Sequence, residues 1–263
     1  KLFPVLNTHA IVLVSSQLPV GSVRQLQEQY KNSYPSAAIY FACSPENLRL
    51  GKAIEVFTQP DRVVVGVDSN KVKEKLAQLF APFTQNIVWM SVASAEMTKH
   101  ALNAFLATSV VFINELATLC ERVGADAREV ERGLKSEMRI GAKAYLKPGA
   151  AFAGGTLARD VSYLIQIGQK QQLPTQLFSA VIESNHAHKV WTQRRLMDVL
   201  GKLQNKTIAM LGLTYKPGTD TLRRSISIET CRWLQQQGAI VVAHDPAIKE
   251  LPEDLHGIIK LQP

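Results

Sequence analysis

Apolar and polar residues alternate along the first third of this chain in a way that predicts strands separated by helices. The apolar runs of strand length, rich in β-branched residues, lie at residues 9–15, 37–43, 62–67 and 86–90. Between them, residues 23–33 and 71–79 carry apolar positions at helical spacing. This order predicts a mostly parallel sheet that helices cover on both faces.

A long helical pattern follows at residues 94–123. Apolar residues recur there at spacings of three to five, with neither Gly nor Pro to interrupt them. A helix of about 30 residues would be roughly 45 Å long, which is longer than most helices in globular domains. We therefore predict a central helix with more than one neighbour, followed by helices at residues 127–134, 159–170 and 176–200.

The end of the chain begins a second α/β unit. Residues 206–213 and 240–243 have strand patterns, and residues 225–237 have a helical pattern that ends before Gly238. Two strands do not bury a sheet, and residue 1 is Lys rather than an initiator Met, so we expect both ends to be trimmed. The predicted fold is α/β, with truncated parallel sheets at both ends joined by a long central helix and a helical domain.

The chain is basic, with 30 Lys and Arg against 22 Asp and Glu and a net charge of +8. Positive charge favours an anionic partner, whether nucleic acid, an anionic membrane or a phosphorylated metabolite; a solvated basic surface is the alternative. Only 7% of the residues are aromatic, and no stacking platform or nucleic-acid-binding motif occurs. We therefore expect no nucleic-acid partner.

The three cysteines, Cys43, Cys120 and Cys231, are too few and too widely spaced for a disulfide framework or a zinc knuckle. Their places in strand and helix patterns predict buried thiols in a reducing compartment. No apolar run approaches the length that spans a membrane, and no signal peptide occurs. These features predict a cytoplasmic protein with no metal site and no membrane insertion.

Eight segments, in order, resemble the nucleotide-sugar dehydrogenases. Five carry the main motifs, namely LPVGS (18–22), SPENLRLGKA (44–53), EMTKHALNAFLA (96–107), RIGAKAYLKPGAAFAGGTLARD (139–160) and LGLTYKPGTDTLRRS (211–225). Shorter fits are PDRVVVG (60–66), INELATLCERVGAD (113–126) and HDP (244–246). Because these segments cover nearly the whole chain in register, it is similar to the UDP-glucose and GDP-mannose dehydrogenase family.

The resemblance implies three domains, which we place at residues 1–92, 93–201 and 202–263. The first would be the later part of a Rossmann-like NAD-binding domain, and the second a helical domain that forms a homodimer through the long helix. The third would begin the domain that binds a nucleotide-diphosphate sugar, with UDP favoured over GDP. The phosphate turn G-x-G-x-x-G is absent, and residues 149–155 do not replace it because they neither follow a strand nor have its spacing.

The family oxidises a sugar primary alcohol to a carboxylate in two hydride transfers to NAD, and a cysteine captures the aldehyde between them. By resemblance, Lys99 and Asn103, four residues apart on one helix face, stabilise negative charge on the reacting oxygen. Asp160 positions a water molecule, and Glu46 is a further catalytic carboxylate. Taken singly, an exposed lysine, a packing asparagine and a turn-capping glutamate are the structural alternatives.

Several family positions are changed in this chain. Thr156 stands where the family has its catalytic cysteine, and a threonine hydroxyl stays protonated near neutral pH. Leu50 and Gln17 replace a second glutamate and a threonine, and Arg159 replaces a lysine. The changes cluster on the aldehyde-to-acid half of the reaction, which predicts that this half is impaired.

Positions that the resemblance assigns to ligand binding are better kept. Those for the nucleotide-diphosphate sugar are Lys147, Phe152, Gly154, Lys216, Tyr215 and Arg139, the last reaching the site of a neighbouring subunit. Arg223 matches an arginine near the NAD diphosphate. Two hypotheses stay open: a dehydrogenase that stops at the aldehyde or uses an unusual nucleophile, and an inactive relative that binds a nucleotide sugar or a scaffold partner in polysaccharide biosynthesis. The retained lysines and arginines disfavour a third, purely structural role for the long helix.

Overall fold

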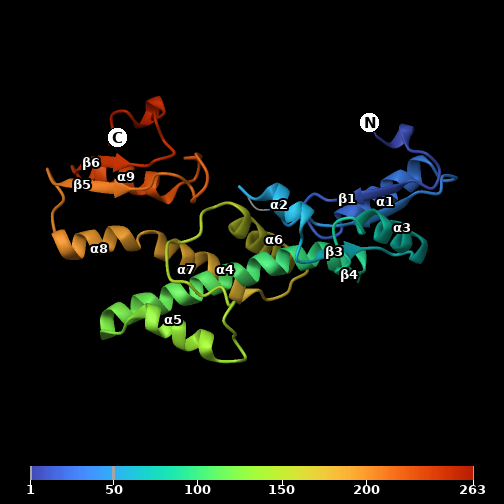
Figure 1. Cartoon of the computed structure of the whole chain (residues 1–263), viewed down its shortest axis with the longest axis horizontal. Helices are drawn as coiled ribbons and strands as arrows, with labels where there is room; N and C mark the ends of the chain where they lie inside the picture. Colours follow the sequence, from blue (N-terminus) through green and yellow to red (C-terminus); the bar gives the residue numbers. More distant parts are fainter. Residues whose placement is uncertain (1, 49–50, 263) are drawn as a thin grey trace. The chain divides into compact units, whose positions relative to one another are not determined.

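The computed structural model describes residues 2–48 and 51–262. The chain forms two compact units, one of residues 1–102 and the other of residues 103–263, and Figure 1 traces the elements of each. Leu50, one of the changed family positions, lies outside the described residues. The long helix contributes its first turns to the first unit and the rest to the second.

A four-stranded sheet organises the first unit. Its strands, in spatial order, are β1 (Ile11–Val14), β2 (Tyr40–Cys43), β3 (Val63–Gly66) and β4 (Ile87–Met90). The outer pairs, β1 with β2 and β3 with β4, are parallel, whereas β2 meets β3 antiparallel at the single pair Cys43 and Gly66. The sheet is therefore mostly parallel, as the alternation of strands and helices predicts.

Helices cover both faces of this sheet. They are α1 (Ser22–Ser33) on one face and α3 (Asn70–Phe80) on the other. The unit also contains the short elements η1 (Phe3–Val5) and α2 (Ala53–Thr58). Along β2 the side chains alternate, so that Phe41 packs in one cluster with α1 and Ala42 in another with Val72 and Leu76 of α3. The sequence did not predict α2, because six residues without a buried side chain are too few to show a period.

The long helix, α4 (Val92–Val123), has 32 residues and begins two residues before the prediction. By length and composition alone it would be able to cross a membrane, a criterion that core helices of soluble proteins also meet. The expectation that no apolar run is long enough is therefore wrong, because no Asp, Glu, Lys or Arg occurs from residue 100 to residue 114. Buried polar residues, among them Asn103 and Asn114, interrupt this apolar stretch.

Four shorter helices complete the helical part of the second unit. They are α5 (Ala127–Ser136), α6 (Thr156–Lys170), α7 (Gln176–Lys189) and α8 (Trp191–Leu200). A buried cluster joins α4, α6 and α7 through residues such as Ala107, Val161 and Val181. The prediction of one helix at residues 176–200 is wrong, because Val190 adopts φ −89° and ψ 8° and divides it. Neither Gly nor Pro marks this break in the sequence.

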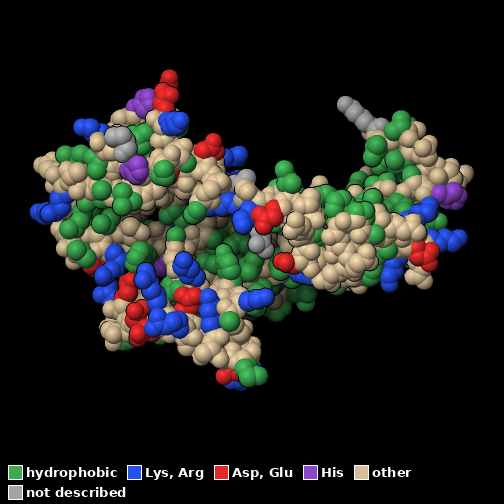
Figure 2. Space-filling model, in the orientation of Figure 1, with side chains coloured by type: hydrophobic (Ala, Val, Ile, Leu, Met, Phe, Trp, Pro, Cys, Tyr) green, Lys and Arg blue, Asp and Glu red, His purple; other side chains and the backbone are tan. Residues whose placement is uncertain are grey.

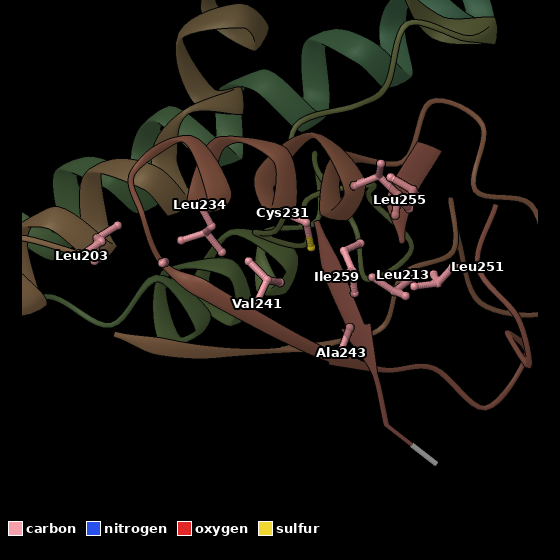
Figure 3. Close-up of a cluster of buried hydrophobic side chains, with 11 residues drawn as sticks. Leu203, Leu213, Cys231, Leu234, Val241, Ala243, Leu251, Leu255 and Ile259 are labelled. Atoms are coloured by element: carbon pink, nitrogen blue, oxygen red, sulfur yellow. The ribbon is translucent and has the colours of Figure 1, made fainter. Parts of the chain in front are cut away.

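The C-terminal part of the second unit is a small parallel sheet covered by one helix. Its strands are β5 (Thr207–Leu211), β6 (Ile240–His244) and β7 (Ile259–Leu261), with α9 (Ile226–Gln236) between the first two and η2 (Glu253–Leu255) before the third. Figure 3 shows Cys231 and Leu234 of α9 above Val241 and Ala243 of β6. The expectation of only two strands is wrong, because a run of three residues is too short to be recognised as a strand.

Charged side chains of both signs lie side by side over α5, as Figure 2 shows. Lys135 pairs with Glu131 at 2.6 Å and Arg132 with Glu129 at 3.3 Å. The Arg132–Glu129 pair is exposed and the Lys135–Glu131 pair is partly buried. Such pairs at a helix surface stabilise it only slightly. At this part of the surface the basic residues therefore belong to an ordinary solvated face.

Candidate functional site

The centre of the candidate site in the second unit is a buried pair of side chains. Asn103 of α4 donates a hydrogen bond from Nδ2 to Oδ2 of Asp160, and Asp160 is 0% exposed. The Oδ1 atom of Asp160 lies 3.9 Å from Nε of Arg159. Burial strengthens such charge-assisted bonds. The structure thus brings together two of the predicted catalytic residues.

Thr156 is the first residue of α6, where Gly155 is the N-cap. It is exposed and lies four residues before Asp160, so both are on the same side of the helix. A helix start lowers the pKa of a thiol and so favours its reactive thiolate. A threonine at the same place has no comparable ionisation near neutral pH.

The three cysteines do not replace the missing thiol. All are buried. Burial raises the pKa of the Cys43 thiol to about 12, and the nearby Glu96 carboxylate adds to this rise. Burial alone raises the pKa of the Cys231 thiol to about 11. Both thiols therefore stay protonated and shielded at neutral pH.

The loop of residues 147–155, which precedes α6, is held by three side chains that the sequence analysis did not identify. Asn114 of α4 accepts from the N–H of Gly149 at 2.9 Å and donates to the carbonyl of Ala150 at 3.3 Å. Asn185 of α7 accepts from the N–H of Phe152 at 2.9 Å and donates to its carbonyl at 2.8 Å. Nε2 of His188 lies 2.9 Å from the Gly149 carbonyl. The only sequence signal for these contacts was an asparagine at a helix position where the pattern predicts an apolar residue.

The predicted binding segments of the second unit meet at the start of α6. A Cβ atom placed on Gly155 would lie 3.2 Å from the hydroxyl oxygen of Tyr215 and 3.9 Å from Nη1 of Arg224. Phe152 is buried beside this point and Gly154 is exposed. The loop after β5 and the loop of residues 147–155 therefore adjoin, as one binding site requires.

A buried carboxylate shapes the loop after β5. Asp245 accepts hydrogen bonds from the N–H groups of Leu213 at 2.6 Å, Thr214 at 3.0 Å and Ala247 at 2.9 Å. Burial opposes the ionisation of Asp245, but these N–H groups outweigh it and lower its pKa. Lys216 follows, half-buried, and its carbonyl accepts from the Thr219 hydroxyl at 3.0 Å.

The remaining predicted cations of the second unit are exposed. Arg139 donates from Nε to Glu137 at 2.9 Å, and this bond, together with the Arg139 N–H, lowers the pKa of Glu137. Lys147 is exposed at the beginning of its loop. Arg223 borders a hollow of about 360 Å³ that Arg224 and Arg232 also line. In the described parts of the chain, no group of three His, Cys, Asp or Glu residues is placed to hold a metal ion.

The first unit holds the other predicted catalytic residues. Lys99 of α4 donates from Nζ to Oδ1 of Asn47 at 3.0 Å. Glu46 is exposed, and its carboxylate accepts from the N–H of Leu48 at 2.5 Å. With this bond Glu46 caps a turn, which is the structural alternative to a catalytic role. Its catalytic role stays a prediction.

Two further residues of α4 hold the LPVGS turn, and the sequence analysis missed them. Glu96 is 3% exposed and accepts from the N–H groups of Gly21 at 2.6 Å and Val23 at 3.0 Å. Nε2 of His100 lies 2.9 Å from the carbonyl of Leu18. The sequence signal for Glu96 and His100 was an ionisable residue at a helix position where the pattern predicts an apolar one. Gln17, one of the changed family positions, lies next to this turn.

Three family models match the chain in the order that the resemblance implies. The NAD binding domain of the UDP-glucose/GDP-mannose dehydrogenase family matches residues 1–84, its central domain residues 93–187 and its UDP binding domain residues 209–261. The predicted domain limits stay a prediction, and the compact units divide within α4.

Curated relatives are UDP-glucose 6-dehydrogenases. The enzyme TuaD of Bacillus subtilis is 38% identical over 242 residues, which cover 92% of this chain and 52% of the relative. The enzyme of Rhizobium meliloti is 35% identical over 247 residues, which cover 92% of this chain and 56% of the relative. The chain thus spans about half the length of the curated relatives it matches.

Solved structures confirm the fold. A UDP-glucose dehydrogenase from Pyrobaculum islandicum superposes with a TM-score of 0.87 at 29% identity, over 96% of this chain and 59% of that one. A UDP-D-ManNAc dehydrogenase from Pyrococcus horikoshii superposes with a TM-score of 0.81 at 21% identity, over 99% of this chain and 64% of that one. At that identity the second likeness supports the fold alone.

Proposed function

The chain belongs to the UDP-glucose/GDP-mannose dehydrogenase family, and from this membership we propose that it takes part in the NAD-dependent oxidation of the primary alcohol of a nucleotide sugar. The observation that carries the proposal is the buried contact between Asn103 and Asp160 behind the start of α6. An amide and a carboxylate so placed suit a reaction that moves protons while negative charge develops on oxygen.

UDP-glucose is the substrate that we propose, in preference to a GDP-sugar. The curated relatives named above are UDP-glucose 6-dehydrogenases, and a UDP binding domain model matches residues 209–261. The residues proposed to bind the diphosphate sugar are Lys147, Phe152, Gly154, Tyr215, Lys216 and, in the site of a neighbouring subunit, Arg139. The adjoining loops at the start of α6 support this assignment.

The proposed catalytic roles follow the family. Lys99 and Asn103, one turn apart on α4, stabilise the negative charge of the reacting oxygen. Asp160 holds the amide of Asn103 and orients a water molecule, and Glu46 is a further proton-handling carboxylate.

NAD is the cofactor that we propose, and it supplies the acceptor for the hydride. The part of this chain that we propose for its diphosphate is the exposed guanidinium of Arg223 at the hollow described above, where Arg224 also lies and Arg232 is paired with Asp254. Planar guanidinium groups suit phosphate oxygens through paired hydrogen bonds. Arg223 would therefore bind and orient the cofactor rather than react with the sugar.

The oxidation is proposed to halt at the aldehyde because Thr156 occupies the cysteine position. A thiolate would add to the aldehyde and permit the second oxidation, whereas a neutral hydroxyl is a much weaker nucleophile. The buried cysteines offer no substitute. The same replacement favours the second candidate function, an inactive protein that binds a nucleotide sugar or acts as a scaffold in polysaccharide biosynthesis.

The deciding experiment measures NADH formed per UDP-glucose consumed by the full-length gene product. One equivalent is expected for a reaction that stops at the aldehyde. Two equivalents would show that Thr156 does not limit the reaction. No NADH, with UDP-glucose binding retained, would establish the binding protein instead.

A cysteine variant adds a direct control. Thr156→Cys is expected to raise the yield from one equivalent of NADH towards two, because a thiol at a helix start is readily ionised. Thr192→Cys, which adds a thiol on α8 outside the loop, should leave the yield unchanged.

A cytoplasmic homodimer formed through α4 is the assembly that we propose. Three large apolar side chains recur on this helix every seven residues and stay exposed, Phe105 at 70%, Phe112 at 50% and Leu119 at 62%. Residues seven apart lie on nearly one face of a helix, and such an apolar face favours contact with a second copy.

Light scattering coupled to size exclusion tests the dimer. Phe112→Asp, which puts a charge in the middle of the stripe, should produce monomers. Phe57→Asp changes an equally large exposed side chain on α2 and should leave a dimer. A monomeric wild-type chain, or a dimer that tolerates Phe112→Asp, would contradict the proposal.

A further inference from the structure

The loop of residues 147–155 has no helix or strand to satisfy its backbone. Glycines at positions 149, 154 and 155 add conformational freedom that the loop loses when it becomes ordered. Something else must therefore fix its shape. The candidates are the three side chains of α4 and α7 that contact its backbone.

Asn185 makes the most complete of these contacts. Its amide both accepts from the N–H and donates to the carbonyl of Phe152, at 2.9 and 2.8 Å, so one side chain pairs with one residue as a neighbouring strand would. Asn185 is only 4% exposed. A buried amide is stable only when it is paired, so this residue is placed to hold the loop rather than to fill space.

Asn114 and His188 act together at the other end of the loop. Asn114 is 2% exposed. It accepts a hydrogen bond from the N–H of Gly149 and donates one to the carbonyl of Ala150. His188 approaches the Gly149 carbonyl from α7, and because a carbonyl only accepts, Nε2 of His188 is the donor. Both backbone groups of Gly149 are thus engaged by side chains from two helices.

These contacts leave other backbone groups of the loop open. Among the residues that the structure describes, the N–H groups of Ala153 and Gly154 have no protein acceptor. Successive unpaired N–H groups beside a helix start favour an anion such as a diphosphate.

We propose that Asn114, Asn185 and His188 are positioning residues, which hold the backbone of residues 149–152 so that the open N–H groups after them are preset for a nucleoside diphosphate. The inference rests on the proposed function for the identity of the ligand. The positioning itself does not depend on it. None of the three side chains needs to touch the ligand or react.

His188 is the residue to test, because it is half-buried and a replacement there is tolerated more readily than at the buried asparagines. His188→Leu removes the donor to Gly149, whereas His188→Gln keeps an N–H donor on a side chain of similar reach. His186→Leu is the matched control, since His186 is exposed two residues earlier on the same helix.

Two measurements on this chain separate the outcomes. Hydrogen exchange of the peptide that contains residues 147–155, without ligand, should become about fivefold faster in His188→Leu. Binding of UDP by titration calorimetry should weaken by about the same factor. His188→Gln should restore both to within about twofold, and His186→Leu should match the wild type.

Unchanged loop exchange in His188→Leu would overturn the proposal, whatever the chain binds. Faster exchange without rescue by His188→Gln would do so too, because the lost contact would then be packing and not a hydrogen bond. If exchange responds as expected but the wild type binds no UDP, the positioning stands and the proposed ligand fails.

Discussion

Two irregular segments of this protein are held by side chains in different ways. In the first unit, the turn of residues 18–22 is held by the ionisable side chains Glu96 and His100. In the second unit, the loop of residues 147–155 is held mainly by the neutral amides of Asn114 and Asn185.

The difference follows from what each backbone needs. The turn leads into α1, whose N-cap Gly21 has no side chain to accept from the first N–H groups of the helix. A carboxylate only accepts, and its charge suits the positive end of a helix, so Glu96 replaces the missing cap. The loop is part of no helix or strand, so its N–H and carbonyl groups both need partners, and a side-chain amide supplies an acceptor and a donor together.

The largest expected effect comes from removing the carboxylate. Glu96→Leu should destabilise the first unit by about 3 kcal/mol, because two N–H groups lose a charged acceptor in a buried place. Native-state hydrogen exchange of peptides from β1 and β2 measures this change for that unit alone.

The control lies on the surface of the same unit. Glu28 pairs with Arg24 at 2.9 Å, but both side chains are exposed, so Glu28→Leu should cost less than about 0.5 kcal/mol. Equal losses in the two variants would mean that Glu96 is not a cap and that the contrast between the two segments is wrong.

Much of the fold could be predicted because its signals are local. The strands and the long helix α4 stand out through their periods. No Gly or Pro interrupts α4, and Gly124 directly follows its last residue. The division at Val190 and the strand β7 have no such signal. A backbone change without Gly or Pro, and a strand of three residues, depend on packing that a single sequence does not reveal.

The candidate site also contains residues that the sequence predicted and residues that it did not. Asn103 and Asp160 were assigned together through motifs of the family, and the structure places them in contact. Glu96 and Asn185 were missed because their partners are backbone groups at least 33 residues away. Backbone groups are alike at every position, so no residue pattern marks the one that a side chain will bind.

Removing an amide from the second unit should have the next largest effect. Asn185→Leu leaves both backbone groups of Phe152 without partners, which should cost about 2 kcal/mol. Exchange of peptides from α6 and α7 reports it. Glu183→Leu, at an exposed position of the same helix, should change little. If Asn185→Leu were neutral, the loop would be held by packing and the amides would be incidental.

Acid should weaken backbone contacts made by a carboxylate but not those made by a neutral amide. Asp245, a carboxylate in the second unit, allows this to be tested. Because N–H bonds lower the pKa of Asp245 despite its burial, its contribution to stability is present above the unfolded value of about 3.9. That contribution is lost as the pH falls through the lower folded value. Asp245→Asn should therefore lower the Tm at pH 7, and the gap to the wild type should shrink below about pH 4.

The pH series is read from thermal unfolding by circular dichroism between pH 7 and pH 3. Asp198→Asn, in an exposed pair on α8, serves as the control for removing one surface charge. A constant gap between Asp245→Asn and the wild type over the whole range would show that Asp245 is not a charged acceptor in the folded chain.

The smallest effect concerns the end of the loop that no side-chain hydrogen bond fixes. A methyl group added at Gly155 would lie 3.2 Å from the Tyr215 hydroxyl oxygen, so Gly155→Ala should be less costly when Tyr215→Phe has removed that oxygen. A double-mutant cycle on the thermal unfolding of the second unit should give a coupling of about 0.5 kcal/mol. Without coupling, Tyr215 does not restrain the loop, and the amides of α4 and α7 with His188 fix it alone. With coupling, the two loops of the candidate site are in close contact at Gly155, whereas the turn of residues 18–22 is held by Glu96 and His100.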